Sequence, residues 1–260
     1  MPSLSRRGLL AAVSSLCLAL AACGGGTSGS YSGSTLDGQV LMDATAPVVG
    51  SANVCIWGIA NGQGNPLNTN VSPPTNTGTL LTNGCLSTNA QGQFSADLTS
   101  FYGPVLVQIF SGSYASRATG TTVGLNSLSA TNASLQAIAF VGGGGTVNVT
   151  ITPLTTIAVS MANSMPGSLT MANYQTAAAK VATEFQLGGV NVTSAPASGD
   201  PQDLVLRGVE QYLAFAPGAT DDPSAANLLT WNTAALGTMS ADFTSAYNTI
   251  NGTSASFSFY

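Results

Sequence analysis

Between residues 35 and 151, apolar and polar residues alternate in short runs that are separated by turn residues. Alternation with a period of two is typical of strands that bury one face, so the pattern predicts an all-β domain. The run Val105–Phe110 is largely apolar and rich in β-branched residues, which favours a central strand. The predicted strands are Gly38–Met42, Ala52–Trp57, Thr79–Ser87, Gln93–Leu98, Val105–Phe110, Tyr114–Ala118, Leu135–Val141 and Thr146–Ile151.

Two connections in this region are distinctive. Residues Asn61–Gly78 are rich in Asn, Gly, Pro and Thr, and they predict a long exposed loop. The run Gly142–Gly145 lies between two predicted strands and predicts a hairpin turn. A phosphate-binding loop is the alternative, but such a loop needs a following helix and usually a lysine, and neither is present.

At Thr152-Pro153 the hydrophobic period changes from two to that of a helix. Thr152 suits the N-cap of a first helix and Pro153 its first turn, and Asp200 suits the N-cap of a third helix that starts at Pro201. The second helix is predicted at about Thr170–Leu187, ended by Gly188-Gly189. The fourth is predicted to begin near Asp222-Pro223 and to continue past a kink near Gly237 to Ile250.

No linker separates the last predicted strand from the first helix, and the later helices carry few charges. An apolar helix face needs a partner. We therefore expect the helical region 152–260 to pack against the β-domain 35–151.

The N-terminus combines Arg6 and Arg7, an apolar run from Leu9 to Ala22 and then a cysteine, Cys23. This is the organisation of a secretory signal peptide, residues 1–22, with an apolar run too short to span a bilayer comfortably. The residues Leu20–Cys23 resemble the bacterial lipobox, which implies that Cys23 carries the lipid, acyl chains such as palmitate, and becomes the mature N-terminus. An ordinary signal peptide with an incidental Cys23 is the alternative.

Residues 23–34, which are rich in Gly and Ser, predict a flexible linker between the lipid and the folded part. Gly24 follows the cysteine, and by similarity to the sorting of known lipoproteins this favours the outer membrane, on its periplasmic or surface-exposed side. Residues Ser5–Leu10 resemble a twin-arginine export motif. A basic segment of the kind that any secretory signal needs is the alternative.

The low content of charged residues excludes some classes of function. Hydrophobic residues make up 44% of the chain and charged residues only 6%, with a mean hydropathy of +0.29. Beyond Cys23 the only basic residues are Arg117, Lys180 and Arg207, against ten acidic ones. Phosphate binding needs a basic patch, so a nucleic-acid partner is excluded. No second apolar run is long enough to span a membrane.

Histidine is absent, which removes the commonest general base and the commonest metal ligand. Cys17 leaves with the signal peptide and Cys23 takes the lipid, so Cys55 and Cys85 remain. In an oxidising compartment this pair predicts a disulfide, and two reduced, buried thiols are the alternative.

Part of the β-region also resembles a known family. The residues that carry the resemblance are Gly38, Gln39, Val40, Asp43, Pro47, Val48, Gly50, Ala52, Val54, Asn89–Phe94, Asp97, Leu98, Gly103 and Val105–Val107. They are similar to the carboxypeptidase-regulatory-like (prealbumin-like) repeat, over about Thr35–Ala118. The resemblance implies an α+β chain: an Ig/prealbumin-like antiparallel β-sandwich followed by a small helical region. The Asn61–Gly78 insertion and the cysteine pair depart from that pattern, and the family has no catalytic residues to transfer.

Three sets of residues could carry chemistry. Paired carboxylates could serve glycoside hydrolysis, and the candidate pairs are Asp200 with Asp203, Asp221 with Asp222, and Glu184 with Glu210. Helix capping is the alternative for these acids. Asp37 and Asp43 could bind calcium or be solvated turn residues. Trp57, Tyr102 and Tyr114 could form a sugar-stacking platform or pack in the core over the disulfide.

The sequence thus predicts a non-catalytic envelope lipoprotein with a binding or assembly role, without cofactor or metal. Its expected partners are the membrane, through the N-terminal lipid, and an envelope protein or glycan. The alternative is an envelope glycan-active enzyme that uses carboxylates of the helical half.

Overall fold

The computed structural model describes residues 34–50, 52–59, 67–68, 75–76, 79–98, 101–125, 135–142, 144–215, 231 and 233–260. The predicted signal peptide, Cys23, the predicted linker up to residue 33, and most of the predicted loop 61–78 lie outside these ranges. Asp221 and Asp222 also lie outside them.

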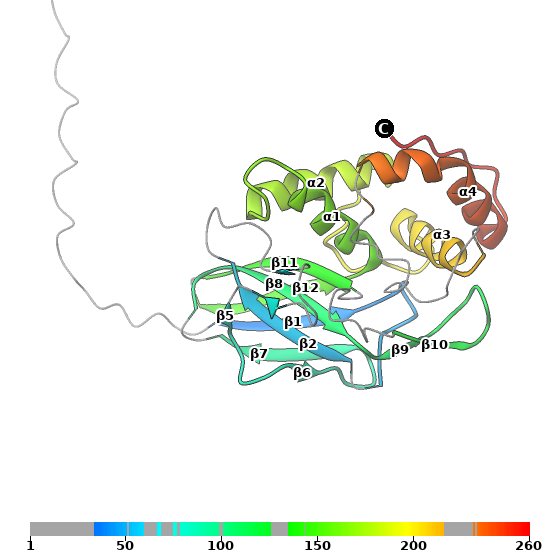
Figure 1. Ribbon diagram of the computed structural model, residues 1–260. Helices are drawn as coiled ribbons and strands as arrows, with labels where there is room; N and C mark the ends of the chain where they lie inside the picture. The colour runs from blue at the N-terminus through cyan, green and yellow to red at the C-terminus, as the bar shows by residue number, and fades with distance from the viewer. Residues whose placement is uncertain are drawn as a thin grey trace, which may run out of the picture. The chain divides into compact units, whose positions relative to one another are not determined.

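In the part of the chain that the structure describes, mostly antiparallel sheets and four helices make this an α+β fold (Figure 1). The strands are β1 (Ser34–Val40), β2 (Asn53–Gly58), β3 (Leu67–Asn68), β4 (Thr75–Asn76), β5 (Thr79–Leu80), β6 (Leu86–Ser87), β7 (Gln93–Asp97), β8 (Gly103–Phe110), β9 (Ser113–Ala115), β10 (Thr122–Gly124), β11 (Leu135–Val141) and β12 (Gly145–Ile151). The helices are α1 (Pro153–Asn163), α2 (Met171–Glu184), α3 (Pro201–Phe215) and α4 (Thr233–Asn251).

The first main sheet has the order β12-β1-β7. β1 pairs with β7 in antiparallel fashion but with β12 in parallel, from Ser34 opposite Gly145 to Val40 opposite Ile151. The expected purely antiparallel arrangement is therefore wrong for this ladder. Parallel pairing is available because β1 and β12 are far apart in sequence and joined by the rest of the β-region.

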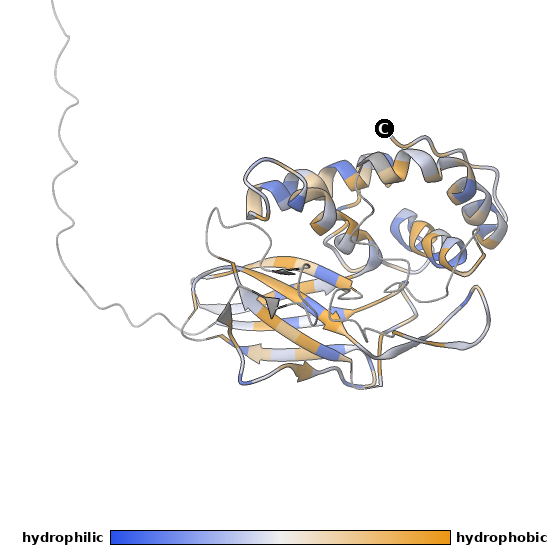
Figure 2. Cartoon of the chain, viewed as in Figure 1, coloured by the Kyte–Doolittle hydropathy of each residue, from blue (hydrophilic) through white to orange (hydrophobic). Residues whose placement is uncertain are grey.

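The second main sheet has the order β11-β8-β2-β5, with β6 also paired to β2, and all its ladders are antiparallel. β8 lies between two strands, as the apolar run predicted, and its residues Gly103–Ile109 are all buried. Figure 2 shows mainly apolar residues along β8 and β2. Both main sheets contribute to one hydrophobic core, with Leu36 and Val40 from the first and Val54 and Ile56 from the second.

Several predicted β-elements need correction. The predicted strand Thr79–Ser87 is two strands, β5 and β6, separated by a turn in which Gly84 has a φ of +89°. The predicted strand Tyr114–Ala118 ends at Ala115, and its partner β10 was not predicted.

The glycine run Gly142–Gly145 is not a hairpin turn, because β11 and β12 belong to different sheets. It carries the chain from one sheet to the other.

The start of α1 matches the prediction. Thr152 is the N-cap, its side chain accepts a hydrogen bond from the Thr155 N–H, and the Thr155 hydroxyl accepts one from the Thr152 N–H. This reciprocal capping box satisfies two donors that have no partner within the helix. Pro153 occupies the first turn, where a missing N–H costs nothing.

The end of α2 differs from the prediction. The helix ends at Glu184, before Gly188-Gly189, because Gln186 adopts a φ of +54°. The Leu187 N–H then bonds to the Ala182 carbonyl at 2.9 Å and the Gln186 N–H to the Thr183 carbonyl at 3.1 Å. This is a Schellman motif, and it buries Leu187 completely.

The predicted start of the fourth helix near Asp222-Pro223 lies outside the described residues. One continuous helix from there to Ile250 is wrong. Trp231 is not helical, and α4 begins at Thr233.

The helices pack against the β-region, as the missing linker predicts. Ten consecutive residues of α1, Pro153–Ala162, are buried, and α1 lies between β11 and α2. α3 packs on α4, and an aromatic cluster of Phe185, Phe243, Tyr247, Phe257 and Phe259 joins α2, α4 and the C-terminal segment. Within the described residues, no helix combines the length and the apolar character needed to cross a membrane.

Candidate functional site

The predicted acid pairs do not form a common site. Asp200 caps α3, accepting hydrogen bonds from the Asp203 N–H at 2.7 Å and the Ala197 N–H at 2.8 Å. Glu184 instead lies 3.7 Å from the Lys180 ammonium and accepts a hydrogen bond from the Tyr260 N–H at 2.9 Å. Capping and local ion pairing therefore account for these acids, while Asp221 and Asp222 lie outside the described residues.

Asp203, Glu210 and Asp43 instead belong to a buried ionic network that joins α3 to two turns of the β-region. Asp203 is fully buried, pairs with Arg207, and accepts a hydrogen bond from the Ala44 N–H at 3.0 Å. Asp43, also fully buried, lies 2.7 Å from the Arg117 Nε.

Glu210 accepts a hydrogen bond from the backbone N–H of Arg117. Burial raises the pKa of the Glu210 carboxyl; hydrogen bonds from Ser116, Ala118 and Arg117 lower it, and the charge of Asp43 raises it further. Sequence reasoning missed this network because its partners lie up to 159 positions apart in the chain. The one signal in the sequence was the scarcity of basic residues, since two of the three beyond Cys23 belong to this network.

The calcium hypothesis finds no support at its two acids. The Arg117 guanidinium occupies the place beside Asp43 that a cation would take. Asp37 accepts a hydrogen bond from the Ser95 hydroxyl at 2.6 Å on the exposed side of β1. Across the described part of the chain, no group of three or more His, Cys, Asp or Glu residues is placed to hold a metal ion.

The three aromatic residues proposed as a sugar platform have different environments. Tyr114 is buried, so it offers no ring face to a ligand. Tyr102 is 63% exposed and packs edge-on against Phe140 with ring centroids 5.4 Å apart. Trp57 is half-buried on β2. A shared stacking platform of these three is therefore wrong.

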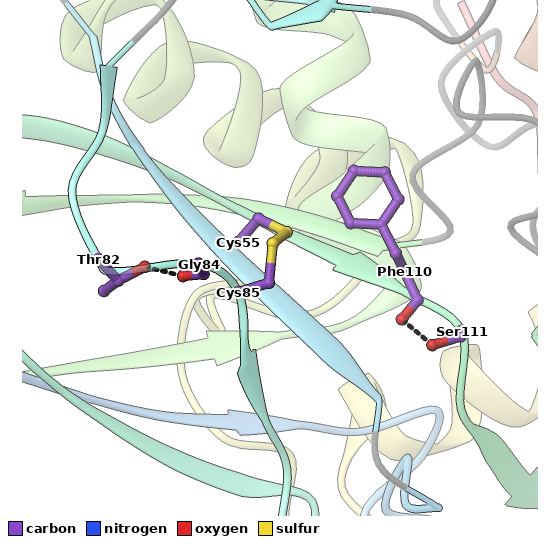
Figure 3. The surroundings of a disulfide bond; sticks show 6 residues. All are labelled: Cys55, Thr82, Gly84, Cys85, Phe110 and Ser111. Carbon is purple, nitrogen blue, oxygen red and sulfur yellow. Dashed lines mark hydrogen bonds between the residues drawn. A yellow bond between two sulfur atoms is a disulfide. The ribbon is translucent and has the colours of Figure 1, made fainter.

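The predicted disulfide is present. It joins Cys55 of β2 to Cys85, the residue before β6, with the two Cα atoms 4.4 Å apart (Figure 3). In the turn before Cys85, the Thr82 hydroxyl donates a hydrogen bond to the Gly84 carbonyl. The bond therefore fixes the β5–β6 turn to β2, beside the β2–β6 ladder.

A mainly apolar hollow lies between α2 and the two strands β11 and β12, and we call it the α2 groove. Its volume is about 840 Å³. It is lined by Ile138–Phe140, Val147–Thr150, Met171, Tyr174, Gln175, Ala178, Ala179, Ala182, Thr183, Gln186 and residues of the segment 188–193. None of the described residues that line it carries a charge. The side chains of Ala178, Ala179 and Ala182 are small and project little from α2, so they leave the hollow unfilled.

Tyr174 is the one strongly perturbed group in the α2 groove. It is 1% exposed, and burial raises the pKa of its hydroxyl. The backbone of Ile138 lies close enough to offset part of that effect, but no hydrogen bond of ordinary geometry satisfies the hydroxyl. A buried hydroxyl in this state favours a ligand that supplies a partner.

A second hollow, of about 900 Å³, covers the outer side of the first main sheet. Its residues include Asp37, Gln39, Gln93 and Ser95, so it is polar and almost uncharged. It shares Asn148, Val149 and Thr150 with the α2 groove. The two hollows therefore meet along β12.

Sequence reasoning did not predict the α2 groove. The usable signal was the uncharged alanine-rich face of the second helix, but whether such a face is covered depends on how far the helix stands from the sheet. Comparison with family models, curated proteins and solved structures finds no match to this chain.

Proposed function

We propose that this chain is a lipid-anchored binding protein of the bacterial envelope. Cys23 carries the lipid at the outer membrane, a prealbumin-like sandwich forms the β-region, and the α2 groove receives the ligand. The signal-like N-terminus and the lipobox-like residues Leu20–Cys23 support the anchor.

The turn between β6 and β7 supports the prealbumin-like assignment. The Asn89 side chain accepts hydrogen bonds from the N–H groups of Gln91 and Gln93, both at 2.9 Å. Gly92 follows with a φ of +69°, and Phe94 then enters the core. A Cβ at Gly38 would lie 2.1 Å from the Phe94 ring, so the glycine makes room for the aromatic side chain. A turn glycine followed by an aromatic residue in the core is what the resemblance implies.

The observation that carries the binding role is the size and chemistry of the α2 groove. Its volume of about 840 Å³ falls in the range of roughly 300–1,000 Å³ that small-molecule and cofactor sites occupy. Apolar side chains line it, uncharged polar groups rim it, and a buried hydroxyl lacks a partner. This combination favours an uncharged ligand, because a charge would lose its hydration without gaining an ion partner.

The glycan-active enzyme is the weaker alternative. Two carboxylates must stand about 5 Å, or roughly 6.5–9.5 Å, apart across a bound sugar. Asp203 and Glu210 are committed to the ionic network, and Asp200 and Glu184 to backbone N–H groups. None of these acids lines the α2 groove.

Binding of an uncharged fluorescent probe tests the role of the groove. N-phenyl-1-naphthylamine should brighten saturably with the wild-type protein, and Ala179→Phe should weaken its binding at least tenfold by filling the groove. Ala172→Phe is the matched control, because Ala172 is an exposed alanine of α2 that does not line the groove. Absence of saturable binding, or equal binding by both variants, would contradict the proposal.

A further inference from the structure

We infer that the α2 groove accepts an extended, uncharged peptide segment, which pairs as an added strand with the free edge of β12. This inference rests on the proposed binding role and names the class of ligand.

The free edge of β12 faces the groove. Four consecutive residues, Val147–Thr150, line the hollow. Successive side chains of a strand point to opposite faces, so a hollow that touches four in a row lies against the edge of the strand. Among the described strands β12 is paired with β1 alone, and its other edge is without a strand partner.

The ladder identifies the groups on that edge. The Leu41 N–H bonds to the Ile151 carbonyl at 2.9 Å, continuing the parallel β1–β12 ladder. Ile151 therefore directs its backbone groups toward β1, and by alternation Val149 and Val147 do the same. The N–H and carbonyl groups of Asn148 and Thr150 then point away from β1, along the side that faces the groove.

The peptide does not pair with the neighbouring strand β11, because the edge of β11 that faces the groove is already occupied. The Gln136 N–H donates to the Thr156 hydroxyl at 2.8 Å, and the Gln136 carbonyl accepts from the Thr155 hydroxyl at 2.8 Å. Further along, the buried Tyr174 side chain of α2 lies against the Ile138 backbone and blocks that part of the edge sterically. Of the described strands that border the groove, this leaves β12 as the one with an open edge.

The surroundings define the peptide. A strand added to β12 would present one face to the apolar wall of α2, with Ala178 and Ala182, and the other to the polar hollow over Gln39 and Gln93. Because the side-chain period of a strand is two, the fitting segment alternates apolar with uncharged polar residues. Among the described lining residues none offers an ion partner, so Lys, Arg, Asp and Glu are disfavoured at the inward positions.

Peptide binding tests this inference. The probes are acetylated and amidated heptapeptides that alternate Val, Ile, Leu or Phe with Ser, Thr or Asn, and they should displace N-phenyl-1-naphthylamine from the wild-type protein. Each binding peptide is then made in two forms, N-methylated at alternate residues along one edge or along the other. Strand addition predicts that one form binds and the other loses at least tenfold, since only one edge meets β12.

Protein variants test the same edge. Asn148→Pro removes an N–H that faces the groove and should weaken peptide binding at least tenfold. Asn148→Ala keeps that N–H and should bind within about threefold of wild type. Thr146→Pro is the matched control, because Thr146 has the same outward orientation on β12 but does not line the groove. Thermal unfolding checks that each variant is folded.

The outcomes separate the two proposals. Probe binding without displacement by any heptapeptide would overturn the peptide inference and leave the binding role intact. Equal binding of the two methylated forms, or unchanged binding by Asn148→Pro, would overturn it as well. A concentration-dependent dimer that Asn148→Pro abolishes would show that a second copy is the occupant and contradict the inference. Failure of the probe itself would remove the binding role, and the inference with it.

Discussion

Removal of the Asp203 charge should destabilise the protein strongly, because the carboxylate is buried and satisfies three donors. Its oxygens accept hydrogen bonds from the Ala44 N–H at 3.0 Å and the Gly199 N–H at 2.7 Å, and they pair with Arg207. In Asp203→Asn, the new amide nitrogen must face a donor on one side or the other. In either orientation one backbone N–H, of Ala44 or of Gly199, loses its acceptor, and Arg207 loses its counter-charge.

The expected magnitude follows from the burial of the pair. Breaking a buried ion pair by removing one partner costs about 3–5 kcal/mol. The Arg207 side chain keeps 19% exposure and can regain some hydration, so the lower end, about 3 kcal/mol, applies. For a chain of this size, that corresponds to a fall in Tm of about 6–12 °C.

Urea unfolding followed by circular dichroism measures this loss, with Asp242→Asn as the matched control. Asp242 lies exposed on α4, so the same change of charge should alter the free energy of unfolding by no more than about 0.5 kcal/mol. The double variant Asp203→Asn with Arg207→Met should lose less than Asp203→Asn alone, since no charge is then left unpaired. Losses within 1 kcal/mol of each other for Asp203→Asn and Asp242→Asn would refute the role assigned to the network.

Three further predictions test other parts of the fold. Because burial raises the pKa of Glu210 above its ordinary value of 4.5, its stabilising contribution is full below pH 4.5 and is lost as pH rises through the raised pKa. As pH rises across that range, the Tm of Glu210→Gln should therefore increase relative to that of wild type. A Tm difference that does not change with pH would contradict the raised pKa of Glu210. Cys85→Ala should lower the free energy of unfolding by about 3–4 kcal/mol, the chain-entropy value for a disulfide that joins residues 30 positions apart. An unchanged midpoint of urea unfolding would exclude the disulfide. Gly38→Ala should lower the free energy of unfolding by about 1–3 kcal/mol by clashing with Phe94. Gly237→Ala on α4 should be neutral or stabilising, because its Cβ would make only an ordinary contact 3.8 Å from the Phe259 carbonyl oxygen; the reverse order of Tm values would contradict this account.

Local patterns predicted the elements well where burial and capping act through neighbours in sequence. The apolar run at β8, the alternation at β11 and the cap at Thr152 each depend on a few adjacent residues, and the structure has them as predicted. The turn at Thr82–Gly84 was not predicted, because apolar residues on both sides of it make residues 79–87 look like one strand.

Pairing and site formation could not be predicted in the same way. The parallel β1–β12 ladder joins residues more than a hundred positions apart, and no local pattern records which strand meets which. The end of α2 at Gln186 was missed because a glutamine takes the left-handed position that glycine usually fills. The ionic network and the α2 groove likewise depend on how α2 and α3 stand against the sheets, which follows from packing of the whole chain.

Anchoring through Cys23 is the premise of the proposed role at the envelope, and the mass of the mature N-terminal peptide tests it most directly. Protein extracted from intact cells should yield an N-terminal peptide that begins at Cys23, lacks residues 1–22 and carries the added mass of a diacylglyceryl group with acyl chains. Cys23→Ser should lose that mass and partition into the aqueous phase of a detergent extraction. An N-terminal peptide with an unmodified Cys23, or one that begins elsewhere, would contradict the lipid anchor.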